Sequence, residues 1–295
     1  MDYKLILYDV GEFGIARITL NNPERMNPLS WEMLSELDNA LVTAEKDDNV
    51  KVIVIKGAGR CFSSGYELGR TLIGDEPRGR KAEEWQGSLW NSRAHTSGHA
   101  DYWFRVWDMW KIVISQVHGY CFGGATELAT ICDLMVISDN CWYGYPITRY
   151  QNVGDVGAHN AWHVGLKRAM ELQLGRILTG KEAYEWGLAN YCFPAEELEE
   201  QTTKIAKRVA IMDPELLMLH KTMVHRTFEV MGFRTAEYYS AEYDTFGHAR
   251  RSMRKIPEYE KWNELKDKYG LGKALKMMHK PFGGLMPGGL NEYDL

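Results

Sequence analysis

The chain of 295 residues is long enough to bury a substantial core, and its 45% hydrophobic and 25% charged residues are typical of a globular protein. The formal net charge of −5 argues against a general nucleic-acid-binding protein, which would carry a basic excess. No stretch approaches the roughly 18 uninterrupted apolar residues of a membrane-spanning helix, which argues against a membrane protein.

The five cysteines form no CxxC pair, and their odd number and irregular spacing predict reduced thiols instead of a disulfide framework or a zinc site. We therefore expect no metal. The start of the chain passes directly into an alternating pattern, with no basic segment followed by an apolar run, so no secretory signal is expected. Together these features predict a cytoplasmic protein.

The first part of the chain predicts a hairpin, a helix and a buried strand. Residues 4–8 and 15–20 are β-type runs separated by glycines, which is typical of a hairpin. Ser30 is a typical helix N-cap, and the apolar residues after it recur at helical spacing. The β-branched run at 52–55 is typical of a parallel strand buried on both faces.

Strands and helices alternate through the middle of the chain. Residues 112–117 and 134–137 form further buried-strand runs, and residues 127–132 between them are expected to be helical. This alternation favours an α/β fold with crossover connections.

The last part of the chain is expected to be mostly helical. Mostly helical spacing begins at Ala169 and continues through Ile177 to Leu188, where residues 187–190 interrupt it, and a β run follows that ends at Pro194. Helices are expected to fill most of 195–255. Glycine and proline beyond about residue 280 predict an irregular arm.

Two glycine turns each follow a predicted strand, at 60–68 and at 118–127. Ligands collect at the carboxyl ends of strands in open α/β sheets, and glycine permits close backbone approach. A helix that begins at Gly124 would point unpaired N–H groups at a bound oxygen, and two converging N–H groups form an oxyanion hole. The alternative is that both are simply tight strand-to-helix turns. The phosphate-loop patterns GxGxxG and GxxxxGK[ST] are absent from these turns.

Three segments carry a more specific pattern: SSGYEL at 63–68, HGYCFGGATELA at 118–129, and LTGKEAYEWGLAN at 178–190. Their order and spacing resemble the crotonase (enoyl-CoA hydratase/isomerase) superfamily over roughly residues 3–250. The resemblance implies an α/β fold with a ββα spiral core at 1–195, a helical trimerisation region at 196–260 and a C-terminal extension at 261–295. It also implies a homo-oligomer, either a trimer or a dimer of trimers.

The same resemblance implies an oxyanion hole for an acyl-CoA thioester. The backbone N–H groups of Tyr66 and Gly124 match the two donors of the family, and Ser64, Gly65 and Gly123 match residues that contact the substrate. Such a hole stabilises the enolate-like charge on the thioester oxygen, but it does not decide what reaction follows.

The residues expected to move protons depart from the hydratase pattern. Glu127 matches one of the two catalytic glutamates, although a glutamate in the first turn of a helix can equally be a dipole-stabilising residue. The second glutamate corresponds to Ile147, which cannot transfer a proton. Asp155 resembles the aspartate of the dienoyl-CoA isomerase branch and is a candidate substitute, or else a turn former or helix cap. Tyr145 is assigned to the substrate site by the same resemblance, while His159 is expected to be a satisfied structural histidine.

Substrate contacts are also expected outside the turns. Arg25 and Met26 match the loop that meets CoA in relatives, and Arg25 can bind phosphate. Tyr243 and Phe246 resemble the helix that covers a neighbouring subunit's site. The aromatic-rich stretch at 85–110 is expected to line the acyl pocket and suits a bulky acyl group. Trp103, Trp107 and Trp110 within it lie at helical spacing, so they are expected first of all in the core.

Hydration or dehydration of an enoyl-CoA is the default reaction that the resemblance implies, with CoA as part of the substrate and no other cofactor. The alternatives are isomerisation of an unsaturated acyl-CoA and hydrolytic C–C cleavage of a cyclic β-keto substrate. A crotonase-like binding protein without catalysis is the remaining possibility. No nucleic-acid or membrane partner is expected.

Overall fold

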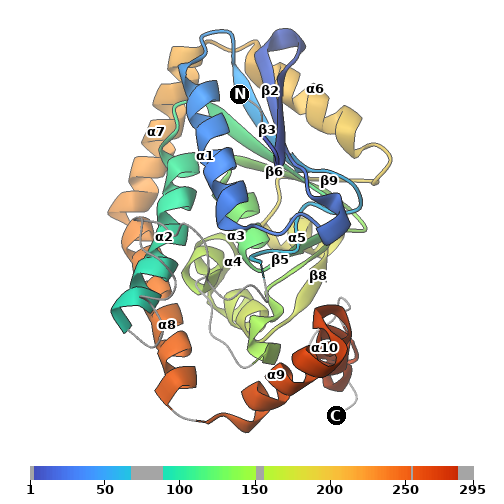
Figure 1. The fold of residues 1–295 in the computed structure, drawn as a ribbon. Coiled ribbons are helices and arrows are strands. Elements are labelled where there is room, and N and C mark those ends of the chain that lie inside the picture. The colour runs from blue at the N-terminus through green and yellow to red at the C-terminus, as the bar shows by residue number, and fades with distance from the viewer. Residues whose placement is uncertain (1–2, 68–88, 151–155, 254, 285–295) are drawn as a thin grey trace.

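A computed structural model describes residues 3–67, 89–150, 156–253 and 255–284 of the chain (Figure 1). Its main sheet has six strands, and every neighbouring pair is parallel except the first, which forms the predicted hairpin. In spatial order the strands are β1 (Ile6–Val10), β2 (Ile15–Leu20), β3 (Val52–Gly57), β4 (Ile112–Val117), β6 (Leu134–Ser138) and β9 (Tyr191–Phe193).

Helices cover both faces of this sheet because its strands are apolar on both sides. In β3, Ile53 and Ile55 pack on one face while Val52 and Val54 pack on the other, as the period of two requires. The larger core lies under α1 (Trp31–Lys46), α2 (Leu89–Asp108) and α3 (Gly124–Ile131), and the smaller one lies under α6 (Leu198–Ala210). Figure 1 shows α6 on the opposite side of the sheet from α1 and α2. The α/β prediction is confirmed.

Local signals account for the helix starts. Ser30 caps α1, and its hydroxyl accepts a hydrogen bond from Met33 N, as expected. Thr179 and Glu182 form a reciprocal capping box at the start of α5 (Gly180–Trp186).

A second, three-stranded sheet was not expected from the sequence. It consists of β5 (Tyr120–Phe122), β7 (Trp142–Gly144) and β8 (Ile177–Thr179). The helical prediction at Ile177 is therefore wrong: the residue pairs with Gly144 across the sheet and is fully buried. The helix expected from Ala169 begins earlier, as α4 (Val156–Gln173). Strands of three residues are too short to be recognised by periodicity.

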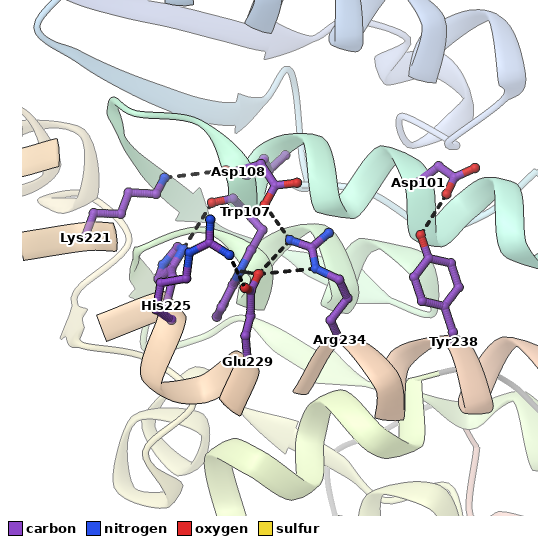
Figure 2. Close-up of polar contacts among 10 residues, drawn as sticks. Asp101, Trp107, Asp108, Lys221, His225, Glu229, Arg234 and Tyr238 are labelled. Carbon is purple, nitrogen blue, oxygen red and sulfur yellow. Dashed lines mark hydrogen bonds and ion pairs between the residues drawn. The ribbon is translucent and has the colours of Figure 1, made fainter. Parts of the chain in front are cut away.

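The C-terminal helices α7 (Pro214–Val230) and α8 (Phe233–Met253) are tied to α2 by polar contacts (Figure 2). Arg234 donates to Glu229 and to Asp108, and Trp107 Nε1 also donates to Glu229, at 3.2 Å. One α8 side chain thereby joins the end of α2 to the end of α7.

Beyond α8 the chain forms α9 (Pro257–Tyr269), α10 (Leu271–His279) and the short helix η5 (Lys280–Phe282). These helices pack against η4 (Pro146–Tyr150), on the side of the molecule away from the hairpin (Figure 1). Residues 285–295, which include most of the expected irregular arm, lie outside the described residues. The division of the chain at residues 195 and 260 stays a prediction.

Arg149 holds this C-terminal extension in place. Its guanidinium is 2% exposed, and it donates to the carbonyls of Gly175, at 2.6 Å, and Gly284, at 3.0 Å. It also lies 3.3 Å from His279 Nδ1 and over the ring of Phe282. Arg149 therefore links η4 to the last described turn of the chain.

Candidate functional site

The two predicted glycine turns lie directly against each other. Ser63 and Cys121 form a parallel bridge, and Phe122 N donates to the Ser63 carbonyl at 3.3 Å. Gly65 has a φ of 88°, and a Cβ at that position would lie 2.3 Å from the Phe122 carbonyl oxygen. Only glycine fits this contact. The structure therefore brings together two turns that are far apart in the sequence.

The two residues predicted to supply oxyanion donors are neighbours. Gly124 is the first residue of α3, and within the described part of the chain its amide donates to no acceptor. The ring of Tyr66 lies over this glycine, since a Cβ on Gly124 would be 2.5–2.7 Å from three atoms of the ring. The amide at the start of a helix also carries the positive end of the helix dipole. That both amides bind a thioester oxygen stays a prediction.

Glu127 lies one turn into α3 and is 2% exposed. Its Oε2 accepts hydrogen bonds from the Tyr66 hydroxyl and from Trp103 Nε1, each at 2.5 Å. The two donors fix the orientation of the carboxylate. A buried, oriented carboxylate next to a polar turn is suited to act as a general acid or base.

An aromatic stack fixes Tyr66 in front of Glu127. The Tyr66 and His99 rings are stacked with centroids 3.9 Å apart, and His99 is stacked in turn on Trp31 at 4.5 Å. Trp103 Nε1 also donates to the Tyr66 hydroxyl at 3.1 Å. Because His99 and Trp103 are four residues apart on α2, they face the same side of that helix.

The aromatic stretch at 85–110 is only partly in the core. Trp103 is 4% exposed and Trp107 is 8% exposed, as expected. Trp110 is 67% exposed, so its prediction is wrong: α2 ends at Asp108, and the helical spacing does not extend to this residue. The beginning of the stretch, 85–88, lies outside the described residues.

Arg25, one of the two residues expected to meet CoA, lines a cavity of about 410 Å³ together with Glu67. Arg25 ends the short helix η2 (Pro23–Arg25), and its guanidinium forms an ion pair with Glu67 at 2.6 Å. Met26 follows in a left-handed conformation with φ 64°, and its carbonyl accepts from Ser64 N at 2.9 Å. The loop at 25–26 and the first glycine turn are therefore joined.

Ile147, which the resemblance places at the position of the second hydratase glutamate, lies in η4 after β7. That correspondence stays a prediction. Tyr145 is 3% exposed, and its ring lies 3.9 Å from where a Cβ on Gly123 would be. Tyr145 therefore adjoins the second glycine turn. Asp155 lies outside the described residues, and its role stays a prediction.

Three residues for which the sequence predicted a role lie on or near α8. His159 is fully buried, with Nδ1 3.1 Å from Glu237 Oε1, so it faces a carboxylate of α8. Tyr243 and Phe246 are 66% and 59% exposed, with ring centroids 5.9 Å apart. Their contact with a neighbouring subunit's substrate stays a prediction.

The sequence placed His99 and Trp103 only within the stretch expected to line the acyl pocket, and it did not single out Trp31. The spacing of His99 and Trp103 is helical and places both on one face of α2, but that spacing is equally typical of core packing. What identifies them is contact with Tyr66 and Glu127. That contact depends on how α2 packs against α3.

Metal and membrane features are absent from the described part of the chain. No group of three or more His, Cys, Asp and Glu side chains there could hold a metal ion, and no described helix is long and apolar enough to cross a membrane. The five cysteines are free, and burial raises the pKa of Cys61 to about 11.

Comparison with known proteins agrees with this arrangement. The enoyl-CoA hydratase/isomerase family model matches residues 11–261. EchA13 of Mycobacterium tuberculosis, which carries an enoyl-CoA hydratase name, is 32% identical over 250 residues, covering 80% of this chain and 78% of its own. A Delta(3,5)-Delta(2,4)-dienoyl-CoA isomerase of Arabidopsis thaliana is 28% identical over 228 residues, covering 74% and 79%.

A solved structure shares the whole architecture. The enoyl-CoA hydratase/isomerase of Xanthobacter autotrophicus superposes with a TM-score of 0.83 at 30% identity, covering 95% of this chain and 98% of that one. The chain therefore belongs to the enoyl-CoA hydratase/isomerase family of the crotonase superfamily and has its fold.

Proposed function

We propose that this protein hydrates the double bond of an enoyl-CoA thioester and dehydrates the 3-hydroxyacyl product in the reverse direction. The observation that carries the proposal is the position of Glu127. Its buried carboxylate lies one helical turn from the Gly124 amide and accepts a hydrogen bond from Tyr66 at 2.5 Å. A carboxylate suited to be a general base and an amide suited to bind an anion therefore lie close together at the start of α3, which supports the proposal.

In this mechanism the thioester oxygen accepts hydrogen bonds from the amides of Tyr66 and Gly124. Glu127 takes a proton from water as the water oxygen bonds to the β-carbon and the double-bond electrons move onto the thioester oxygen. The two amides stabilise the resulting enolate, and losing one such donor typically costs about 3–4 kcal/mol of transition-state stabilisation. Protonation of the α-carbon completes the addition. Since every step is a proton transfer or an addition of water, we propose no cofactor beyond the CoA of the substrate.

Isomerisation of an unsaturated acyl-CoA is the second candidate. Ile147 favours it, because water addition in the hydratases uses a second glutamate that this chain lacks. The dienoyl-CoA isomerase name of one relative favours it too. An isomerase needs a base for one carbon and an acid for another, and Asp155 is the proposed partner of Glu127. Hydrolytic C–C cleavage of a cyclic β-keto substrate remains the third alternative.

A panel of enoyl-, dienoyl- and β-ketoacyl-CoA thioesters separates these reactions by the mass and double-bond position of the product. We expect an enoyl-CoA to gain the mass of one water. An unchanged mass with a moved double bond would identify an isomerase, and consumption of only the cyclic β-keto substrate would identify a hydrolase. Tight CoA binding with no thioester consumed would instead indicate a binding protein.

Glu127→Gln preserves the shape of the side chain and removes the base. We expect it to lower turnover by about 10²-fold or more, the usual order for a general base. Asp155→Asn should lower turnover by a similar factor if Asp155 is the partner acid. Full activity of Asp155→Asn would remove that residue from the mechanism.

We also propose a cytoplasmic homo-oligomer, either a trimer or a dimer of trimers. Leu216, Leu219 and Met223 are 56%, 59% and 61% exposed at helical spacing on α7, and an apolar stripe of this kind favours burial against another copy. The free thiols suit a reducing compartment. Light scattering should give a mass of three or six chains, and a monomer would contradict the proposal.

A further inference from the structure

By the resemblance, Ile147 stands where the glutamate that protonates the α-carbon would be, and the candidate substitute Asp155 lies outside the described residues. Of the two groups that donate to Glu127, the Tyr66 hydroxyl can act as an acid, whereas the Trp103 indole N–H cannot. We propose that the Tyr66 hydroxyl is the second acid/base group of this site, and that it protonates the α-carbon while Glu127 acts on water. This inference rests on the proposed function and concerns the side chain of Tyr66, whereas the oxyanion hole uses its backbone amide.

The geometry places the hydroxyl between the two parts of the site. The Tyr66 ring lies over Gly124, whose amide is a proposed oxyanion donor, and its hydroxyl reaches Glu127 Oε2 at 2.5 Å. The enolate would therefore bind beside the ring, with its α-carbon within reach of the same tyrosine. One residue would then supply both an amide to the oxyanion and a hydroxyl to the adjacent carbon.

The surroundings of the hydroxyl suit it to lose and regain a proton. Trp103 Nε1 donates to the Tyr66 oxygen at 3.1 Å and would stabilise a transient phenolate. Stacking on His99, at 3.9 Å, and contact with Gly124 hold the ring in one orientation. Pre-orientation of this kind is what a general acid requires.

The proton balance closes within the pair. Glu127 takes one proton from water, whose oxygen bonds to the β-carbon. Tyr66 gives its proton to the α-carbon, and the enolate electrons return from the thioester oxygen to form the new C–H bond. The phenolate then takes the proton held by Glu127 through their existing hydrogen bond. The site returns to its starting state after the addition of one water, and no other reactant is required.

Tyr66→Phe tests the proposal because it removes only the hydroxyl and keeps the backbone amide, the ring and the stacking on His99. We expect hydration kcat to fall by about 10²-fold with KM changed by less than about threefold. Tyr3→Phe is the matched control, since the Tyr3 hydroxyl also donates to a side-chain oxygen, Asn39 Oδ1, at 2.8 Å, and Tyr3 belongs to neither glycine turn nor to the aromatic stretch. It removes one phenol hydrogen bond, and its kcat should stay within about twofold of the wild type.

A second readout separates this proposal from the hydration itself. Exchange of the α-protons of a saturated acyl-CoA in D₂O requires the enolate and the acid/base pair, but it requires no addition of water. We expect the wild type to exchange these protons and Tyr66→Phe to exchange them about 10²-fold more slowly. Exchange without hydration in the wild type would overturn the proposed hydration and still support the role of Tyr66.

A double variant tests whether Tyr66 and Glu127 act together. If Tyr66 and Glu127 act as one relay, Tyr66→Phe combined with Glu127→Gln should be about as slow as Glu127→Gln alone. Wild-type rates of both hydration and exchange in a folded Tyr66→Phe enzyme would overturn the proposal. So would losses that multiply in the double variant, because independent groups multiply their effects. Wild-type protein that neither hydrates nor exchanges would overturn both proposals.

Discussion

The carboxylate of Asp133 accepts a hydrogen bond from the Lys221 ammonium at 2.8 Å, with only 10% and 3% of the two side chains exposed. Asp133 Oδ1 lies 3.1 Å from His225 Nε2, and Oδ2 also accepts from Val113 N at 2.7 Å. Asp133 follows α3, while Lys221 and His225 lie on α7. The pair therefore fastens the C-terminal helices to the sheet beneath the candidate site.

Asp133→Asn should destabilise the fold. It leaves the Lys221 charge buried beside a neutral amide, and breaking a buried ion pair from one side costs about 3 kcal/mol or more. We expect urea unfolding to show a loss of this size. Asp38→Asn is the control, because its pair with Arg105 is 31% and 53% exposed and should contribute less than about 1 kcal/mol. Equal losses of unfolding free energy in Asp133→Asn and Asp38→Asn would mean that burial of an ion pair does not determine its contribution to stability.

The Asp133 carboxylate should also make the fold less stable in acid. Burial alone would raise the pKa of Asp133, but Lys221 and His225 outweigh it and hold the pKa below its ordinary value of 3.8. The contribution of Asp133 to stability is therefore complete above the ordinary pKa and is lost as pH falls through the lower folded-state pKa. The urea concentration at the unfolding midpoint of the wild type should decrease as the pH is lowered below 4. The midpoint of Asp133→Asn should decrease less over the same range.

His279 should make the stability of the fold depend on pH in a second range, above that of Asp133. Burial first, and the neighbouring Arg149 second, lower the pKa of His279 from 6.5 to about 4. Between these values the unfolded chain binds a proton that the folded chain does not, so stability falls as pH drops from 6.5 to 4. His279→Gln should reduce this slope, while the buried His163, whose pKa burial lowers to about 3, continues to contribute to it. His220→Gln, at an exposed position of α7, should leave it unchanged, and an identical slope in all three proteins would refute the assignment.

Gly124→Ala tests the close approach of Tyr66 to the start of α3. The new Cβ would lie 2.5 Å from the Tyr66 ring, so the ring must move away from Glu127. We expect activity to fall by about 10²-fold, the order for losing one donor or its alignment. Gly272→Ala is the matched control, since nothing lies within 4 Å of its Cβ. Equal activities of the two variants would show that activity does not depend on the position of the Tyr66 ring over Gly124.

The ion pair between Arg25 and Glu67 should weaken the hold of Arg25 on a CoA phosphate. The guanidinium is 57% exposed, but it is neutralised by Glu67 at 2.6 Å. Removing that competition with Glu67→Gln should lower KM for an acyl-CoA by about fivefold, equivalent to about 1 kcal/mol. Arg25→Gln should raise KM by a similar factor without changing kcat. Unchanged KM in both variants would remove Arg25 from the CoA site.

Local sequence signals were sufficient to predict much of the fold. The buried strands β3 and β4 are continuous β-branched runs, and Ser30 provides its own helix cap. Gly65 and Gly123 were recognisable as turns because few other residues adopt a positive φ. These features depend on residues close together in the chain, so the sequence was sufficient to predict them.

The contacts that define the candidate site depend on distant segments. Glu127 meets Trp103 across 24 positions of the chain and Tyr66 across 61. No periodicity encodes such a distance, since it is set by the packing of α2 and α3. For the same reason Trp110 was placed in the core and Ile177 in a helix: their spacing was correct, but the elements end elsewhere.

The meeting of the two glycine turns also sets an order in time. The first turn is held by hydrogen bonds to the second, from Phe62 N to the His118 carbonyl and from Ser63 N to the Tyr120 carbonyl. The bridge between Ser63 and Cys121 also requires β3 and β4 to be aligned side by side. Pairing strands that are so far apart in the chain is slow compared with forming a helix. A chain in which β3 and β4 have not yet paired therefore holds no site, and enzymatic competence arrives only when the sheet has closed.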